Sequence, residues 1–323
     1  ITNLNFPGIH APFELDSDPS AINVTPRILE IYFDNTCNLK CLYCGPHFSS
    51  LWDAENVKFG DPRFPKSTNI ESNKQKLFDW LKNNGKHLTV FNILGGEPLY
   101  QTELDECIEL FNNYPAPELK LQIFTNLNCT LTRLKTTVEK IKQLVELNKI
   151  REFEITASLD CWGAPQEYVR YPLNLESWEE NFEYLIEQSW INLIISSTTT
   201  PLTIKTLPDL LSKIKQWNTT RTVYHYQNSV NNPKYMFIDI FGDIFVDDFK
   251  RALELKLTGT PEHNASRDYL KGIAQQSSHL GPNIPEITNL FNFLNEMDRR
   301  RNTNWSNVFP WLVDEFNRFG LTK

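Results

Sequence analysis

The chain has 323 residues, of which 40% are hydrophobic and 22% charged, a composition typical of a globular protein with a sizeable core rather than of a disordered one. Acidic residues outnumber basic ones by 40 to 32, which gives a net charge of −8 and does not favour a general nucleic-acid-binding surface. No apolar run approaches the roughly 20 residues needed to span a bilayer, and no charged-then-apolar leader opens the chain. We therefore expect a cytoplasmic protein that binds neither membranes nor nucleic acids in general.

Residues 1–27 contain four prolines and show no clear period, which predicts an extended strap. Beyond them, stretches rich in Ile, Val, Phe and Thr alternate with stretches of helical period. Six strands are expected, at 28–34, 88–94, 119–125, 152–159, 191–198 and 222–226. Five helices are expected between them, at 71–83, 102–113, 131–147, 175–188 and 204–216. This alternation predicts an α/β fold with a parallel sheet, a partial (β/α)6 barrel over residues 28–227.

After about residue 227 the pattern changes. Residues 235–245 predict two short strands around Gly242, and helices are expected at 246–256, 266–275, 285–301 and 308–319. We therefore predict a small α+β C-terminal domain over residues 228–323. Three consecutive arginines, Arg299 to Arg301, end one of its helices. They are expected to form a solvated face that suits the helix dipole, with binding of a carboxylate or phosphate as the alternative.

The six cysteines are distributed unevenly along the chain. Cys37, Cys41 and Cys44 lie within eight residues, directly after the first expected strand, whereas the other three are single and none follows residue 161. In a cytosolic protein such a cluster indicates a metal or redox site before it indicates disulfides. Three thiolates at this spacing can ligate three irons of a [4Fe–4S] cluster and leave the fourth iron open. Zinc, with His47 as a fourth ligand, is the alternative.

The Cys-x-x-x-Cys-x-x-Cys spacing, with Tyr43 before the last cysteine, resembles the signature of radical S-adenosylmethionine (radical SAM) enzymes. Further motifs extend the resemblance over the first two thirds of the chain. Gly95-Gly96-Glu97-Pro98 after the second strand is similar to the family's GGEP motif, and Thr125-Asn126 after the third matches its threonine–asparagine position. Ser158-Leu-Asp160, followed by Arg170, is similar to the SxD…R element of the branch that contains peptide maturases and molybdenum-cofactor enzymes. All four motifs are expected at the carboxyl ends of successive strands, where α/β barrels build their active sites.

The resemblance implies both cofactors and residue roles. Cys37, Cys41 and Cys44 would bind a [4Fe–4S] cluster whose open iron chelates S-adenosylmethionine. An electron donor such as flavodoxin or ferredoxin would reduce the cluster, and the resulting 5′-deoxyadenosyl radical would remove a substrate hydrogen. Glu97 would accept hydrogen bonds from the cofactor's ammonium group, and Arg170 would bond its carboxylate. The expected cofactor-binding residues are Tyr43, Gly95, Gly96, Glu97, Thr125, Asn126, Ser158, Asp160 and Arg170.

The same resemblance suggests a ribosomally made peptide as substrate, modified by epimerisation, crosslinking or another oxidative change. A small molecule such as a nucleotide or sugar is the alternative, and a zinc-binding interaction module is the alternative of another class. Because no cysteine follows residue 161, the C-terminal part would be a twitch-type domain without a cysteine-ligated cluster. Cys161, where family members commonly have glycine, would be either a hydrogen-atom donor to a substrate radical or a small buried turn residue.

Overall fold

The computed structural model describes residues 25–65, 70–255, 260–277 and 279–322, so most of the expected N-terminal strap lies outside the described residues. All six expected strands are present, and their ends lie within three residues of the expected positions. Their bounds are β1 (Ile28–Tyr32), β2 (Val90–Leu94), β3 (Ala116–Thr125), β4 (Ile150–Ser158), β5 (Ile191–Thr199) and β6 (Tyr224–Ser229).

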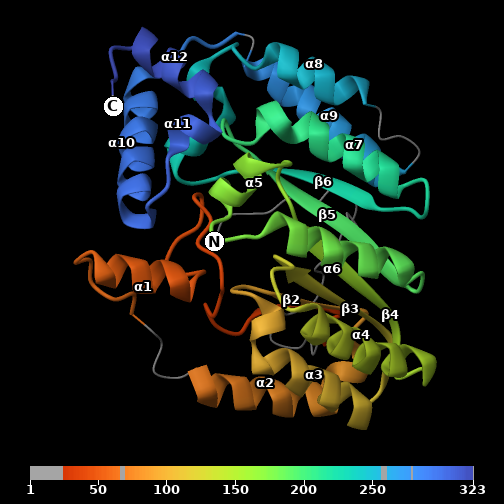
Figure 1. Cartoon of the computed structure of the whole chain (residues 1–323). Helices are drawn as coiled ribbons and strands as arrows, with labels where there is room; N and C mark the ends of the chain where they lie inside the picture. Colours follow the sequence, from red (N-terminus) through yellow and green to blue (C-terminus); the bar gives the residue numbers. More distant parts are fainter. Residues whose placement is uncertain (1–24, 66–69, 256–259, 278, 323) are drawn as a thin grey trace, which may run out of the picture.

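The strands form one parallel sheet in the order β1-β2-β3-β4-β5-β6 (Figure 1). Strand order follows chain order because each crossover returns the chain to the same edge of the growing sheet. The register pairs Tyr32 with Leu94 and Ser158 with Ser196. The carboxyl ends of the strands therefore meet at one rim, and the predicted partial (β/α)6 fold is confirmed.

Helices connect successive strands and pack on one face of the sheet (Figure 1). In α6 and α7, for example, Trp178 stacks on Phe182 with ring centroids 4.9 Å apart, and Trp217 lies 4.7 Å from Phe182. These buried aromatic contacts hold α6 and α7 against each other. The helices of this part are α1 (Ser50–Lys58), α2 (Ile70–Asn84), α3 (Thr102–Asn113), α4 (Leu131–Glu146), α5 (Ala164–Val169), α6 (Leu175–Glu187) and α7 (Leu207–Trp217), with short 3-10 turns η2 (Gly85–His87), η3 (Pro98–Tyr100) and η4 (Ile204–Thr206).

The two strands expected over residues 235–245 are wrong. That stretch forms the 3-10 helices η5 (Lys234–Met236) and η6 (Ile238–Phe241), and Gly242 ends them with φ of +70°. Its apolar side chains are buried against the long helix at residues 284–301. Its backbone does not pair with a strand, and the Ile240 carbonyl instead accepts a hydrogen bond from the Asn283 amide at 2.7 Å. Within the described residues, the C-terminal part is therefore helical and not α+β: α8 (Val246–Glu254), α9 (Pro261–Ser277), α10 (Ile284–Arg301), α11 (Trp305–Val308) and α12 (Pro310–Arg318).

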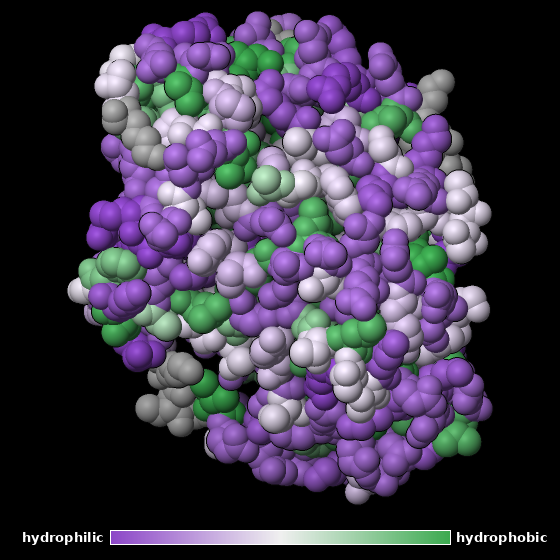
Figure 2. All heavy atoms as spheres, viewed as in Figure 1, coloured by the Kyte–Doolittle hydropathy of each residue, from purple (hydrophilic) through white to green (hydrophobic). Residues whose placement is uncertain are grey.

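The C-terminal helices rest on the sheet and on the loops beyond its rim. Helix α9 lies against β6, whereas α10 stands next to α1 (Figure 1). Tyr168 of α5 donates to Asp298 of α10 at 2.8 Å, and its ring meets Phe309 edge-on at 5.4 Å. Hydrophilic residues cover most of the face shown in Figure 2. None of the described helices combines the length and the apolar character needed to cross a membrane.

Candidate active site

The three clustered cysteines lie on the loop that follows β1, hereafter the thiol loop (residues 37–44). Neighbouring segments hold its backbone on two sides. The indole N–H of Trp52, on α1, donates to the Cys41 carbonyl at 2.8 Å. The amides of Lys40 and Leu42 donate to the carbonyls of Tyr171 and Val169, each at 2.8 Å. The loop is thereby fixed at the rim of the sheet.

All three thiols of the loop are free and largely enclosed. Burial raises the pKa of Cys37 to about 12 and also raises the pKa values of Cys41 and Cys44. Two polar hydrogens nevertheless point at the Cys37 sulfur: the nitrogens of the Leu39 amide and of the Asn126 side-chain amide lie 3.5 and 3.8 Å from Sγ. Such donors favour a thiolate once a metal replaces the proton.

The thiol donor set fits an iron–sulfur cluster. Across the described ranges, no three His, Cys, Asp or Glu side chains converge as they would around one metal ion. A [4Fe–4S] cluster does not require that convergence, because each cysteine ligates a different iron. His47, the fourth ligand in the zinc alternative, packs on Phe48 with ring centroids 4.2 Å apart and lines a neighbouring cavity instead.

A cavity of about 360 Å³ opens in front of the thiols. It combines sulfur, backbone, polar and apolar walls and gathers most of the residues expected from the sequence. Its lining consists of Tyr32, Cys37, Leu39, Cys41, Tyr43, Cys44, Phe48, Leu94, Gly95, Gly96, Phe124, Thr125, Asn126, Ser158 and Arg170.

Gly95 and Gly96 form the cavity wall after β2. Both have positive φ, +78° and +52°, in the region that favours glycine. A Cβ at position 95 would lie 1.9 Å from the Tyr32 ring, and one at position 96 would lie 2.2 Å from the Thr36 carbonyl oxygen. Only glycine fits here, so the wall consists of bare backbone that a ligand can approach closely.

Glu97 ties two cavity loops together and does not line the cavity. Its carboxylate accepts hydrogen bonds from the Thr125 hydroxyl and the Asn126 amide, each at 2.6 Å, and from the Leu99 amide at 3.0 Å. The side chain is 1% exposed, and burial raises its pKa to about 7 although the three donors lower it. In this geometry the Glu97 carboxylate positions Thr125 and Asn126 from behind the cavity wall, and its bond to a cofactor ammonium group stays a prediction.

Asp160 likewise lies behind the cavity wall. It is fully buried and accepts two bonds from Arg170, at 2.8 and 2.9 Å, one from the Tyr43 hydroxyl at 2.6 Å and one from the Thr198 amide at 2.8 Å. In this geometry Asp160 positions Arg170 and Tyr43, and its contact with a cofactor stays a prediction. Arg170 does line the cavity, with Nη1 4.0 Å from the Cys41 Sγ, and its charge is balanced by Asp160. Ser158 lines the same wall.

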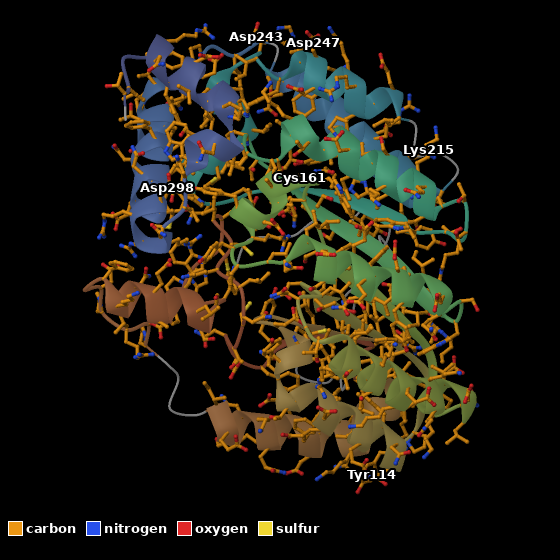
Figure 3. All side chains as sticks on the ribbon, in the orientation of Figure 1. Tyr114, Cys161, Lys215, Asp243, Asp247 and Asp298 are labelled. Atoms are coloured by element: carbon orange, nitrogen blue, oxygen red, sulfur yellow. The ribbon has the colours of Figure 1, made fainter. Side chains whose placement is uncertain are left out.

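Cys161 departs from the expectation of a hydrogen donor at the barrel mouth. Its side chain is fully buried, it is not part of the cavity lining, and its sulfur lies 3.7 Å from Gln166 Oε1 (Figure 3). The side-chain carbonyl oxygen of Gln166, Oε1, also accepts hydrogen bonds from the backbone amides of Asp160 and Cys161, at 3.0 and 3.1 Å. Cys161 thus lies outside the cavity lining, and its role as hydrogen donor or turn residue stays a prediction.

Sequence reasoning missed the apolar side of the cavity. Tyr32, Leu94 and Phe124 occupy the last positions, or nearly the last, of β1, β2 and β3 and line the space. The signal was present, since residues two apart share one face of a strand. Leu94 and Phe124 each lie one residue before a recognised motif, and Tyr32 pairs with Leu94 in the parallel register, so alternation along the strands would have indicated this face.

No family model and no curated protein matches the sequence. Among solved structures, the chain is similar to Streptococcus suis SuiB bound to precursor peptide SuiA (TM-score 0.45, 19% identity, 71% of this chain and 45% of that one). It is also similar to anSMEcpe with bound AdoMet and Kp18Cys peptide (0.42, 17%, 84% and 65%) and to BtrN in complex with AdoMet and 2-DOIA (0.26, 20%, 40% and 45%). The chain spans less than half the length of SuiB. At these identities and TM-scores the likenesses carry no functional conclusion of their own.

Proposed function

We propose that this protein is a radical SAM enzyme, which cleaves S-adenosylmethionine reductively at a [4Fe–4S] cluster held by Cys37, Cys41 and Cys44. One observation carries the proposal: the thiol loop, the bare backbone of Gly95-Gly96 and the side chain of Arg170 face one cavity. The thiol loop follows β1, the two glycines follow β2, and Arg170 caps the carboxyl end of α5 after β4. Unrelated turns and caps have no reason to surround the same space.

The chain's own residues would bind and orient the cluster and S-adenosylmethionine and would shield them from water. Once bound, the cluster and S-adenosylmethionine supply one-electron reduction and hydrogen-atom abstraction. Asp160 holds the guanidinium of Arg170 on two nitrogens, which leaves Nη1 at the cavity for a carboxylate. Leu94 and Phe124 keep water away from the reacting atoms.

The proposed substrate is a ribosomally made peptide, because the Ser158-Leu-Asp160…Arg170 element resembles the peptide-maturase branch. The face of the sheet that carries Tyr32 also exposes Glu30 on β1 and Tyr226 and Asn228 on β6, a broad polar surface suited to an extended chain. An electron donor such as flavodoxin or ferredoxin would reduce the cluster. A nucleotide or sugar as substrate is the alternative.

Anaerobic reconstitution tests the proposal. The protein should bind about four irons and four sulfides per chain and should release 5′-deoxyadenosine from S-adenosylmethionine in the presence of a strong reductant. Replacement of Cys37, Cys41 and Cys44 by alanine should abolish both properties.

Cys107→Ala is the matched control, because Cys107 is a buried free cysteine on α3 that is not part of the cavity lining. This variant should retain the cluster. Full iron content in the triple variant, or stoichiometric zinc in protein purified without oxygen, would overturn the proposal in favour of a zinc-binding module.

The neighbouring genes test the substrate. A short reading frame of precursor type beside the gene, whose product is modified by the reconstituted enzyme, is the expected finding. Genes for nucleotide or sugar biosynthesis, with turnover of such a compound, would replace the peptide with the small molecule.

A further inference from the structure

The last residue of α10, Arg301, does not form part of a solvated face as the sequence suggested. Its side chain is 2% exposed, compared with 59% for Arg299 and 13% for Arg300. The helix ends directly after it, at Asn302, which adopts a left-handed conformation with φ of +54°. The guanidinium is therefore enclosed between α10 and the part of the chain that surrounds the thiol loop.

Arg301 forms a buried ion pair with Glu55 of α1, whose side chain is 3% exposed. Arg301 Nη2 lies 3.0 Å from one Glu55 oxygen, and Nε lies 3.3 Å from both. The flat guanidinium also packs on two aromatic rings, with Cζ 4.7 Å from the Trp52 centroid and 5.4 Å from that of Tyr171. Such cation–π contacts gain strength where water is excluded.

Each partner of Arg301 is bonded in turn to the thiol loop. Glu55 also binds the ammonium group of Lys40, which lies between Cys37 and Cys41. Trp52 donates to the Cys41 carbonyl at 2.8 Å, and the Tyr171 carbonyl accepts from the Lys40 amide at 2.8 Å. Figure 1 shows the arrangement at the level of elements, with α10 standing directly over α1. One side chain from the far end of the sequence thus contacts three supports of the same loop.

The three side chains of this ion-pair group, Lys40, Glu55 and Arg301, together carry a net positive charge. Lys40 and Arg301 are positive and Glu55 alone is negative, whereas the nearby Arg170 is balanced by Asp160. Buried ion pairs contribute little net stability, because desolvation costs about as much as the attraction returns. A net positive charge beside a buried metal cluster, in contrast, favours the more negative, reduced form of that cluster.

We propose that Arg301 is a positioning residue for the cluster, which holds the Lys40–Cys41 segment in place through Glu55, Trp52 and Tyr171 and stabilises the reduced state. This inference rests on the proposed function and adds a role for the C-terminal helices in it. The helices are part of the cofactor site's outer support and not merely a separate lid.

Four variants of the full chain, reconstituted anaerobically, test this role: Arg301→Gln, Arg301→Lys, the double variant Glu55→Gln/Arg301→Gln, and Arg299→Gln as control. Arg299 is exposed and its ion pair is with Glu296 on its own helix. Three quantities are measured for each: the rate of iron loss to a chelator, the midpoint potential with the paramagnetic resonance spectrum of the reduced cluster, and the thermal midpoint.

Arg301→Gln should lose iron about 10-fold faster than wild type, the size typical of outer-shell changes, and should show a lower potential and an altered spectrum. Arg301→Lys should recover part of the potential, because it keeps the charge, but not the slow iron loss, because it lacks the planar fork. The double variant should be no more stable than Arg301→Gln, because it leaves the Lys40 ammonium, whose side chain is 17% exposed, without its Glu55 partner, and its spectrum should stay altered. Arg299→Gln should match wild type.

The inference would be overturned if Arg301→Gln lost iron at the wild-type rate and had the wild-type midpoint potential. It would also be overturned by a double variant that recovers the wild-type spectrum together with its stability, because the effect would then be purely structural. A wild-type protein that binds no cluster at all would instead overturn the proposed function, so the two failures are distinguishable.

Discussion

At the scale of single residues, the shape of the cavity depends on Gly96 having no Cβ atom. The hydrogen side chain of Gly96 lets the chain turn beside the Thr36 carbonyl, which in turn accepts the Glu97 amide at 2.7 Å. Any larger side chain would separate the thiol loop from the loop after β2, because both pack at this one point. Gly96 therefore sets the distance between two walls of the cavity.

Gly96→Ala should destabilise the protein by more than the roughly 1–2 kcal/mol that a left-handed alanine costs, because the Cβ also meets the Thr36 oxygen at 2.2 Å. It should also lower iron content. Thermal denaturation and iron analysis check both effects. Gly60→Ala is the matched control, since its φ is +97° and nothing lies within 4 Å of the added Cβ. Equal losses in the two variants would contradict this account.

The sequence pattern identified the residues of the site better than their roles. The lining includes all three cysteines, both glycines, Asn126, Ser158 and Arg170, as expected. Glu97 and Asp160 are also close by, but their oxygens are occupied by neighbouring donors. Motif spacing predicts which strand end a carboxylate follows. It does not predict which backbone amides reach that carboxylate first.

At the scale of elements, the packing of α9 on β6 places a histidine in a buried seam. His225 is 1% exposed, with Nε2 2.9 Å from the Ser197 hydroxyl and Nδ1 3.2 Å from the Ser266 hydroxyl. Burial, with a further contribution from His263, lowers the pKa of His225 to about 3. The folded protein therefore keeps this ring neutral while the unfolded chain takes up a proton below about pH 6.5.

This seam predicts a pH dependence of stability. Because the unfolded chain binds the proton and the folded one does not, stability falls as pH drops below 6.5, by about 2 kcal/mol at pH 5. His225→Gln should have a lower stability at pH 7 but a flatter change between pH 7 and pH 5. Urea unfolding at both pH values measures the difference. The same substitution at the exposed His87 is the control, and an unchanged slope in His225→Gln would show that the seam does not exclude protons.

Three of the described helices, α1, α5 and α11, were not predicted, and the physical reasons are clear for α1 and α5. The buried side of α1 carries Asp53 and Glu55, so no apolar stripe marks it. Both carboxylates are paired with cations outside the helix, Asp53 with Arg63 and Glu55 with the distant Arg301. Helix α5 has only six residues, too few for a period. Long amphipathic helices such as α4 were predictable because their burial pattern is their sequence pattern.

At the scale of the whole molecule, the sheet and the C-terminal helices share buried contacts. The ring of Phe309 is 2% exposed and packs edge-on against Tyr168, and Asp298 accepts from the same tyrosine (Figure 3). Sequence reasoning placed a domain boundary at residue 227 because the strand pattern stops there. Such joints are made by side chains far apart in the chain, which no local pattern reveals.

Phe309→Ala should therefore destabilise the whole molecule by about 3–5 kcal/mol and keep one cooperative transition. Tryptophan fluorescence and far-ultraviolet circular dichroism, followed together in denaturant, should move in parallel. Tyr114→Ala, at a side chain that is 47% exposed (Figure 3), should change stability by less than about 0.5 kcal/mol. Two separated transitions, of which only one shifts, would support independent domains instead.

The order of the strands has a consequence for the size of what can be modified. Within the described residues the sheet ends at β1 on one side and at β6 on the other, and these two strands do not pair. The face that carries Tyr32 and the cavity is consequently bounded by two free edges and not by a closed ring. A long polymer can lie across it sideways, with both of its ends remaining in solvent. For the proposed peptide substrate, access of that kind would place no upper limit on chain length, and a site in the middle of a large protein would be as reachable as one at its terminus.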